Sequence, residues 1–110
     1  MSFTVYLTNG AAHDLEEIYE YIALRDVPGK ADYVLTQIEK TFLSLSESPD
    51  RGVYPKELSC LGIREFREIF FKPYRIIYSS KGRNVYILLI VDGRRNLQAL
   101  LQRRILGNDT

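Results

Sequence analysis

The segment Val85–Val91, with the sequence VYILLIV, constrains the fold most strongly because every position is apolar or aromatic. Side chains of a strand alternate between two faces, so a strand of this composition has to be covered on both sides. It is much shorter than the roughly 20 residues that span a bilayer. We therefore expect a central strand of a sheet, with other elements packed on both of its faces.

Three further runs have the composition of strands. Phe3–Leu7 alternates and is rich in β-branched and aromatic residues, and the runs at 63–71 and 74–80 are similar. The sequence SKGR at 80–83 is a turn signal that joins the run at 74–80 to the central strand as a hairpin. The second half of the chain therefore predicts a largely antiparallel sheet.

Helices are predicted on both sides of these strands. Thr8 or Asn9 can cap a first helix that ends near Arg25, and Pro28 suits the opening turn of a second. SPDRG at 48–52 ends the second helix, and a last helix follows Gly93. The apolar positions at helical spacing are Ala11, Leu15, Ile18 and Ile22, then Ala31, Val34, Leu35, Ile38, Phe42 and Leu45, and finally Leu97, Leu100, Leu101 and Ile105.

The predicted order is βααβββα, an α+β fold in which a helical hairpin packs on a largely antiparallel sheet. Residues 1–110 are expected to form one domain, with the last four residues, 107–110, as a frayed tail. Nothing at the start resembles a signal peptide, so a cytoplasmic location is expected by default.

Composition excludes several kinds of site. The 45% hydrophobic and 26% charged content is that of an ordinary globular protein. One cysteine, Cys60, excludes an internal disulfide and is interpreted as a small packed residue, and one histidine, His13, weakens any metal-site reading. No glycine-rich phosphate loop is present. We expect no cofactor and no metal.

The charge is distributed unevenly although the net charge is only +1. Residues 1–59 contain five Lys and Arg against ten Asp and Glu, whereas residues 60–110 contain ten against four. One interpretation is that the basic second half contacts an anionic partner such as nucleic acid or an acidic protein. The alternative is that the two halves neutralise each other within the fold.

Arginines beside the predicted strands are the candidates for anion contacts. On a regular strand Arg64 and Arg67 point to opposite faces, and only a bulge brings them together. Arg75 contacts an anion in one interpretation and forms a salt bridge to Glu65 or Glu68 in the other. For Arg94 and Arg95, at the junction of strand and helix, the functional interpretation is favoured.

Tyrosines and one carboxylate are also candidates. Tyr74, Tyr78 and Tyr86 fall in the predicted sheet, where aromatic rings can stack on bases but more often belong to the core. Asp92 ends the central strand as a possible base or as an acceptor for Arg94, without a partner carboxylate nearby.

The ordered set LTNGAAHDLEEIYEYI, SPDRG, GIREFREIFFKPYRIIY and VDGRRNLQALLQRRIL spans nearly the whole chain and resembles the RelE/ParE superfamily. These proteins are the toxins of type II toxin–antitoxin systems. The resemblance implies one of two activities. RelE-like members cleave mRNA in the ribosomal A site, whereas ParE-like members poison DNA gyrase.

The same residues favour the ParE-like branch. Arg75 and Arg94 match arginines that the nucleases use, but Leu100 stands where RelE carries its catalytic tyrosine. Asp92 stands where several relatives of both branches carry histidine, so that position is neutral. Arginine stabilises charge but stays protonated, so it is a poor general base. If the chain were a nuclease, its candidate catalytic residues would be Arg75, Tyr78, Asp92 and Arg94.

The sequence thus predicts a ParE-like toxin that inhibits gyrase, supports plasmid stabilisation and is neutralised by a ParD-like antitoxin. Expected contacts to gyrase or the gyrase–DNA complex are Arg64, Arg75, Arg94 and Arg95. Expected contacts to the antitoxin are Leu15, Ile18, Ile22, Leu97 and Leu101. The alternatives are a nuclease that acts on mRNA at the ribosome and a degenerate, non-toxic member that only binds an antitoxin.

Overall fold

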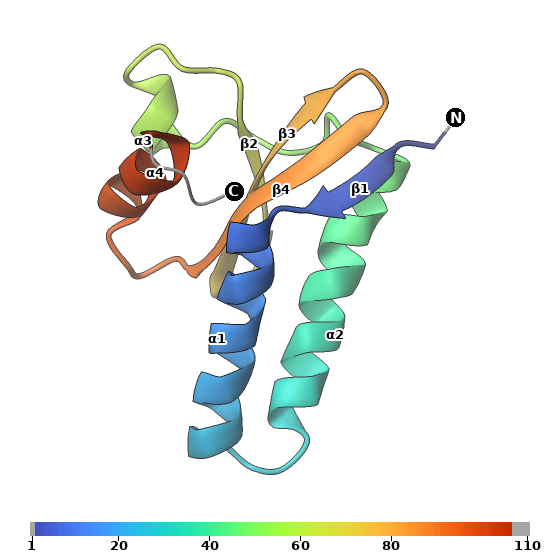
Figure 1. The fold of residues 1–110 in the computed structure, drawn as a ribbon, viewed down its shortest axis with the longest axis vertical. Helices are drawn as coiled ribbons and strands as arrows, with labels where there is room; N and C mark the ends of the chain where they lie inside the picture. The colour runs from blue at the N-terminus through green and yellow to red at the C-terminus, as the bar shows by residue number, and fades with distance from the viewer. Residues whose placement is uncertain (1, 107–110) are drawn as a thin grey trace.

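A computed structural model describes residues 2–106 and contains one four-stranded sheet (Figure 1). The strand order is β1-β4-β3-β2, in which β1 runs parallel to β4 and the other neighbours are antiparallel. The prediction of a largely antiparallel sheet with the apolar run in its interior is confirmed. The strands are β1 (Thr4–Leu7), β2 (Arg67–Phe71), β3 (Tyr74–Lys81) and β4 (Asn84–Asp92).

Helices cover both faces of the sheet. The hairpin of α1 (Asn9–Arg25) and α2 (Lys30–Leu43) packs on one face and extends beyond the strands (Figure 1). The short α3 (Lys56–Ser59) and the terminal α4 (Leu97–Leu106) pack on the other face. A 3-10 turn, η1 (Ser44–Ser46), follows α2. No helix among residues 2–106 is both long and apolar enough to cross a membrane.

The two faces of β4 bury two separate apolar clusters, as its composition requires. Val85, Ile87 and Ile90 pack toward the helical hairpin, whereas Leu89 and Val91 pack toward α3 and α4. A register shift opposite Ile77 and Tyr78 puts an extra β4 residue into the ladder. β2 and β3 add Ile69, Ile76 and Tyr78 to the hairpin-side core, and the predicted helical stripes supply its remaining buried residues: Ala11, Leu15, Ile22, Ala31, Val34, Ile38, Phe42 and Leu45.

Element boundaries follow local chemistry with two departures from the prediction. Thr8 caps α1 by accepting a hydrogen bond from the Ala11 amide, as expected. The second helix begins at Lys30, after Gly29 with φ of 90°, and not at Pro28. The run predicted as a strand at 63–71 becomes one only from Arg67. The predicted fray at 107–110 lies outside the residues that the structure describes.

The edge of β4 beyond its pairing with β1 is covered by side chains. The β1 ladder ends at the pair Leu7 and Ile87. Past that point Asp14 of α1 accepts a hydrogen bond from the Ile90 amide at 3.0 Å, and Arg104 of α4 donates to the Leu88 carbonyl at 2.8 Å. These two side chains satisfy backbone groups that no neighbouring strand reaches.

Candidate functional site

The predicted target-contacting arginines do not gather on one surface. Arg75 lies beneath α3, Arg64 lines a pocket beside the start of β2, and Arg94 and Arg95 line a groove on the hairpin side of the sheet. The basic second half of the chain therefore presents separate cationic regions, and part of its charge is neutralised internally.

Arg75 is held by two carboxylates. Its guanidinium donates to Glu68 at 2.7 and 3.0 Å and to Glu57 twice at 2.9 Å, and its side chain is only 13% exposed. The sequence slightly favours an anion contact for Arg75, but the structure shows the alternative, a salt bridge to Glu68, together with a second carboxylate, Glu57, from α3. Hydrogen bonds from Arg75 lower the pKa of Glu57, and the same bonds raise the pKa of Arg75. These ion pairs join β3 to α3 and β2, which gives Arg75 a structural role.

Tyr78 is fixed in the core. Its hydroxyl donates to the Pro49 carbonyl at 2.7 Å and accepts from the Gly52 amide at 3.0 Å, and the residue is 1% exposed. Burial raises the pKa of Tyr78. Gly52 is required at this approach, because an added Cβ would lie 2.6 Å from the Tyr78 oxygen. The hydroxyl proton of Tyr78 is therefore committed to the Pro49 carbonyl.

Asp92 forms an exposed pair with Arg94, the acceptor role that the sequence allowed. Its carboxylate accepts from Arg94 Nε at 2.9 Å and Nη2 at 2.6 Å, and from the Arg94 amide. These bonds lower the pKa of Asp92, so it is a weak base. Asp92 pairs with Tyr74, the first residue of β3, whereas Tyr78 lies in the middle of that strand. Tyr74 and Tyr78 are four steps apart along the strand, or about 13 Å.

A groove of about 810 Å³ runs between the helical hairpin and the ends of β2, β3 and β4. Its apolar and aromatic lining comes from both layers, and charged residues of both signs surround it. Of the five predicted antitoxin contacts, Ile18 and Ile22 line this groove. The other three, Leu15, Leu97 and Leu101, are buried in the two apolar clusters of the chain itself. Groove residues include Glu17, Tyr21, Asp26, Lys30, Tyr33, Phe71, Tyr74, Arg94 and Arg95.

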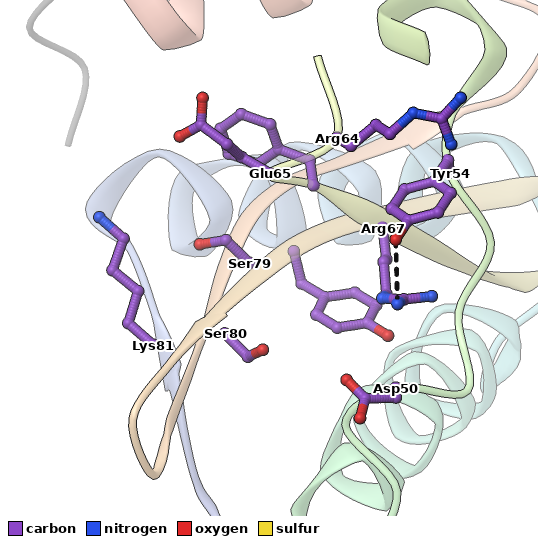
Figure 2. A pocket seen from close by; sticks show the side chains of 10 residues that line it. Asp50, Tyr54, Arg64, Glu65, Arg67, Ser79, Ser80 and Lys81 are labelled. Carbon is purple, nitrogen blue, oxygen red and sulfur yellow. Dashed lines mark hydrogen bonds between the residues drawn. The ribbon is translucent and has the colours of Figure 1, made fainter. Parts of the chain in front are cut away.

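A smaller pocket of about 350 Å³ lies beside the start of β2 (Figure 2). The guanidinium carbons of Arg64 and Arg67 lie 5.3 and 4.6 Å from the ring centre of Tyr54. Sequence reasoning placed these arginines on opposite faces of one strand. They share a ring instead because the strand begins only at Arg67. We name this site the Arg67 pocket; its lining residues are Asp50, Tyr54, Arg64, Glu65, Phe66, Arg67, Tyr78, Ser79, Ser80 and Lys81.

His13 and Cys60 line neither of the two pockets described above. His13 is exposed and lies 3.5 Å from Glu17 on the same helix, in agreement with a surface histidine. Cys60 was expected to be packed, but it is exposed at the C-cap of α3, immediately after the helix ends at Ser59.

Comparison with known proteins identifies the family. The model for the ParE toxin of the type II toxin–antitoxin system parDE matches residues 5–97. Toxin ParE3 of Caulobacter vibrioides is 32% identical to this chain over 100 residues, which are 91% of this chain and 96% of that toxin. The chain belongs to the ParE toxin family. As a ParE-type toxin it is the toxic component of a type II toxin–antitoxin system, as the ordered motifs predicted.

Solved structures show the same fold for this ParE-family chain. A chain of the chromosomal ParDE system of P. aeruginosa superposes with a TM-score of 0.70 at 23% identity, covering 83% of this chain and 96% of its own length. The E. coli toxin RelE in the free state, a double mutant, matches with a TM-score of 0.61 at 13% identity over 96% of this chain and 97% of its own. The toxin–antitoxin complex RelBE2 of Mycobacterium tuberculosis matches at 0.59 with 20% identity, over 84% and 92%.

Proposed function

We propose that this ParE-family toxin acts in the cytoplasm by inhibiting DNA gyrase. The observation that carries the proposal is membership of the ParE family over residues 5–97, together with 32% identity to Toxin ParE3. The site geometry agrees with it, because the candidate nuclease residues do not converge: Arg75 and Tyr78 point to opposite faces of β3, and Tyr78 lies four positions along the strand from the residue that pairs with Asp92.

The chemistry of RNA cleavage argues against the nuclease alternative. Attack of a 2′-hydroxyl on phosphate needs one group to accept a proton and another to donate one. Tyr78 is 1% exposed and its hydroxyl is engaged by Pro49 and Gly52, and Asp92 is already engaged by Arg94 with a lowered pKa. Arg75 is neutralised by Glu57 and Glu68. None of these groups is both free and suited to transfer a proton.

A supercoiling assay tests the proposal directly. Purified gyrase, relaxed plasmid and ATP are incubated with increasing toxin, without ribosomes. The expected result is loss of supercoiled product or accumulation of cleaved plasmid. Unchanged supercoiling at saturating toxin, together with transcript cleavage in a translating extract, would establish the nuclease alternative. Normal growth during induced expression, with neither effect, would identify a non-toxic member.

The partner is proposed to be a ParD-like antitoxin that places an amphipathic helix in the groove. The lining joins the rings of Tyr21, Tyr33 and Tyr74 to the apolar side chains of Ile18 and Phe71. Cations and carboxylates at its margins suit the charged face of such a helix. Tyr21 and Tyr33 are 61% and 53% exposed, so this apolar surface has no cover within the described chain.

Substitutions on one helix test the groove. Tyr21→Asp places a charge in the groove, whereas Leu24→Asp changes an 80% exposed residue of the same helix that does not line it. Binding of the protein encoded by the neighbouring reading frame is measured by calorimetry. Tyr21→Asp is expected to weaken binding at least about tenfold, and Leu24→Asp by less than about twofold. Equal effects of the two variants would place the antitoxin elsewhere.

A further inference from the structure

The Arg67 pocket holds cations that the fold leaves unneutralised. Arg75, Arg94 and Arg104 each form an ion pair with a carboxylate. Among residues 2–106, no carboxylate oxygen lies within 4.0 Å of the charged groups of the cations that line this pocket. Those cations are Arg64, Arg67 and Lys81.

Two carboxylates, Asp50 and Glu65, also line the pocket, but they do not cancel its charge. Neither forms an ion pair with a pocket cation, and Figure 2 shows the carboxylate of Glu65 directed away from Arg67. The lining carries three positive groups against two negative ones. A partly enclosed excess of positive charge attracts anions more strongly than the same charge on an open surface.

The guanidinium of Arg67 is fixed in place before any ligand arrives. It donates to the Gly52 carbonyl at 2.9 Å and to the Tyr54 hydroxyl at 3.2 Å, and its carbon lies over the Tyr54 ring. Gly52 is itself held by the buried Tyr78. A guanidinium has five N–H donors, so Arg67 has further donors for a ligand. Because the side chain is already held in place, ligand binding does not bear the entropic cost of immobilising it.

The pocket lies where β3 loses its neighbour. β2 pairs with β3 only as far as Tyr78, while β3 continues to Lys81. Ser79 and Ser80 therefore line the pocket on an unpaired strand edge, and Figure 2 shows both side chains beside it. Their hydroxyls add hydrogen-bond donors of the kind that contact phosphate oxygens.

An aromatic surface lies next to the pocket. Ser79, Tyr86 and Tyr6 are in register on β3, β4 and β1, so their side chains share one face of the sheet. The rings of Tyr6 and Tyr86 stack with centres 5.6 Å apart, and Tyr6 is 46% exposed. Two strand spacings, about 10 Å, separate Ser79 from Tyr6.

We propose that the Arg67 pocket and the Tyr6–Tyr86 pair together bind a single strand of nucleic acid. One backbone phosphate binds the remaining donors of Arg67, which shares a face of the sheet with Tyr78, and Arg64 and Lys81 attract further phosphates on either side of it. The strand passes the unpaired edge of β3, and a base further along it stacks on Tyr6 on the opposite face. This deepens the proposed function, on which it rests for its biological setting, because gyrase holds DNA. An acidic peptide is the less suitable ligand, since it satisfies the cations but leaves the exposed ring pair without a partner.

The test is fluorescence anisotropy of a labelled oligothymidylate of about 15 nucleotides at about 50 mM salt, without gyrase. The variant Arg64→Gln/Lys81→Gln removes two exposed pocket cations and leaves Arg67 in place. Its matched control, Lys40→Gln/Arg103→Gln, removes one exposed lysine and one exposed arginine elsewhere. Circular dichroism and thermal melting confirm that both are folded.

The pocket variant is expected to bind about tenfold more weakly, and the slope of log Kd against log salt should fall by about 1 to 2. The control variant should stay within about twofold of wild type. Tyr6→Leu should weaken binding about fivefold or more, whereas Tyr21→Leu, at an exposed tyrosine of α1, should not.

Four results would overturn the proposal: no saturable binding by the wild-type toxin, equal losses in the pocket and control variants, no effect of Tyr6→Leu, or displacement by polyglutamate as effective as by unlabelled oligonucleotide. The last would assign the pocket to an acidic protein. Duplex DNA and oligouridylate of the same length show which form of nucleic acid is preferred. Because wild-type toxin is assayed on gyrase separately, failure of strand binding and failure of gyrase inhibition are distinguishable.

Discussion

Arg104 and Asp14 are ninety positions apart in the chain, and their side chains form a two-pronged ion pair. Nη1 and Nη2 of Arg104 donate to the two carboxylate oxygens of Asp14, each at 3.0 Å. The side chains are 13% and 11% exposed. The pair joins α4 to α1 across the open edge of β4, and both residues also bond to the backbone of that strand. It therefore holds elements of both layers to one strand edge.

Breaking this pair should destabilise the whole domain. Arg104→Gln leaves the Asp14 charge nearly buried without its partner and is expected to lower the free energy of unfolding by roughly 2–4 kcal/mol. Urea unfolding followed by circular dichroism measures the change. Arg103→Gln, at the exposed neighbouring position of α4, is the control and should cost less than about 0.5 kcal/mol. Equal effects of the two variants would show that the ion pair contributes nothing.

Tyr78 and Gly52 should behave as one unit. Tyr78→Phe leaves the Gly52 amide and the Pro49 carbonyl without this partner, at an expected cost of about 1–2 kcal/mol. Gly52→Ala places a methyl 2.6 Å from the Tyr78 oxygen and 2.8 Å from the Glu68 carbonyl, with an expected loss of about 2–3 kcal/mol.

A double-mutant cycle tests that coupling. Removal of the hydroxyl relieves the nearest clash but not those with the Glu68 carbonyl and with the ring carbon of residue 78, so the double variant should lose less than the sum of the single variants. Thermal or urea unfolding gives the three values. Strict additivity would mean that the loop moves away from Tyr78 freely.

Sequence periodicity was sufficient to predict the parts of the fold that depend on local patterning. The stripes of α1 and α2 and the apolar run of β4 each specify an element and the face it buries. α3 escaped prediction because its four residues, Lys56–Ser59, complete barely one turn. Because α3 was not predicted, Glu57 was not recognised as the second carboxylate that neutralises Arg75.

The candidate site could not be predicted in full, because it depends on ion pairs between residues far apart in the sequence. The sequence does not show that Arg104 pairs with Asp14, because any carboxylate in the chain could pair with any arginine. The same uncertainty made four arginines look like one basic surface. Only the layering of the sheet separates Arg75 beneath α3 from Arg94 and Arg95 at the groove and from Arg64 beside Tyr54.

Acid should weaken the fold through Glu57. The pKa of Glu57 in the folded state lies below its ordinary value of 4.5, chiefly because Arg75 donates hydrogen bonds to it. A lowered folded-state pKa adds stability above the unfolded value, and this contribution is lost as the pH falls through the lowered value. Glu57→Gln should therefore flatten the dependence of unfolding free energy on pH below about pH 4.5.

Asp92→Asn is the matched comparison for that experiment. Asp92 also has a lowered pKa, but its partner Arg94 is 81% exposed. Solvent and salt screen such a pair, so its effect on stability should be below about 1 kcal/mol and should shrink in high salt. The effect of Glu57→Gln should persist in salt. Urea unfolding from pH 3 to 7 at about 50 mM and about 500 mM salt measures both. A salt-sensitive effect for Glu57 would contradict its sheltered position.

Arg75 provides the sharpest separation of a structural role from a role in target contact. Arg75→Met leaves Glu57 and Glu68 facing each other in a nearly buried site, and the expected loss is roughly 3 kcal/mol or more. In Glu57→Gln/Glu68→Gln/Arg75→Met the uncompensated charges are gone, so much of that stability should return. If Arg75 is structural, inhibition of gyrase should recover along with the unfolding free energy. A triple variant that is as stable as wild type yet inactive would show instead that the target contacts the Arg75 guanidinium.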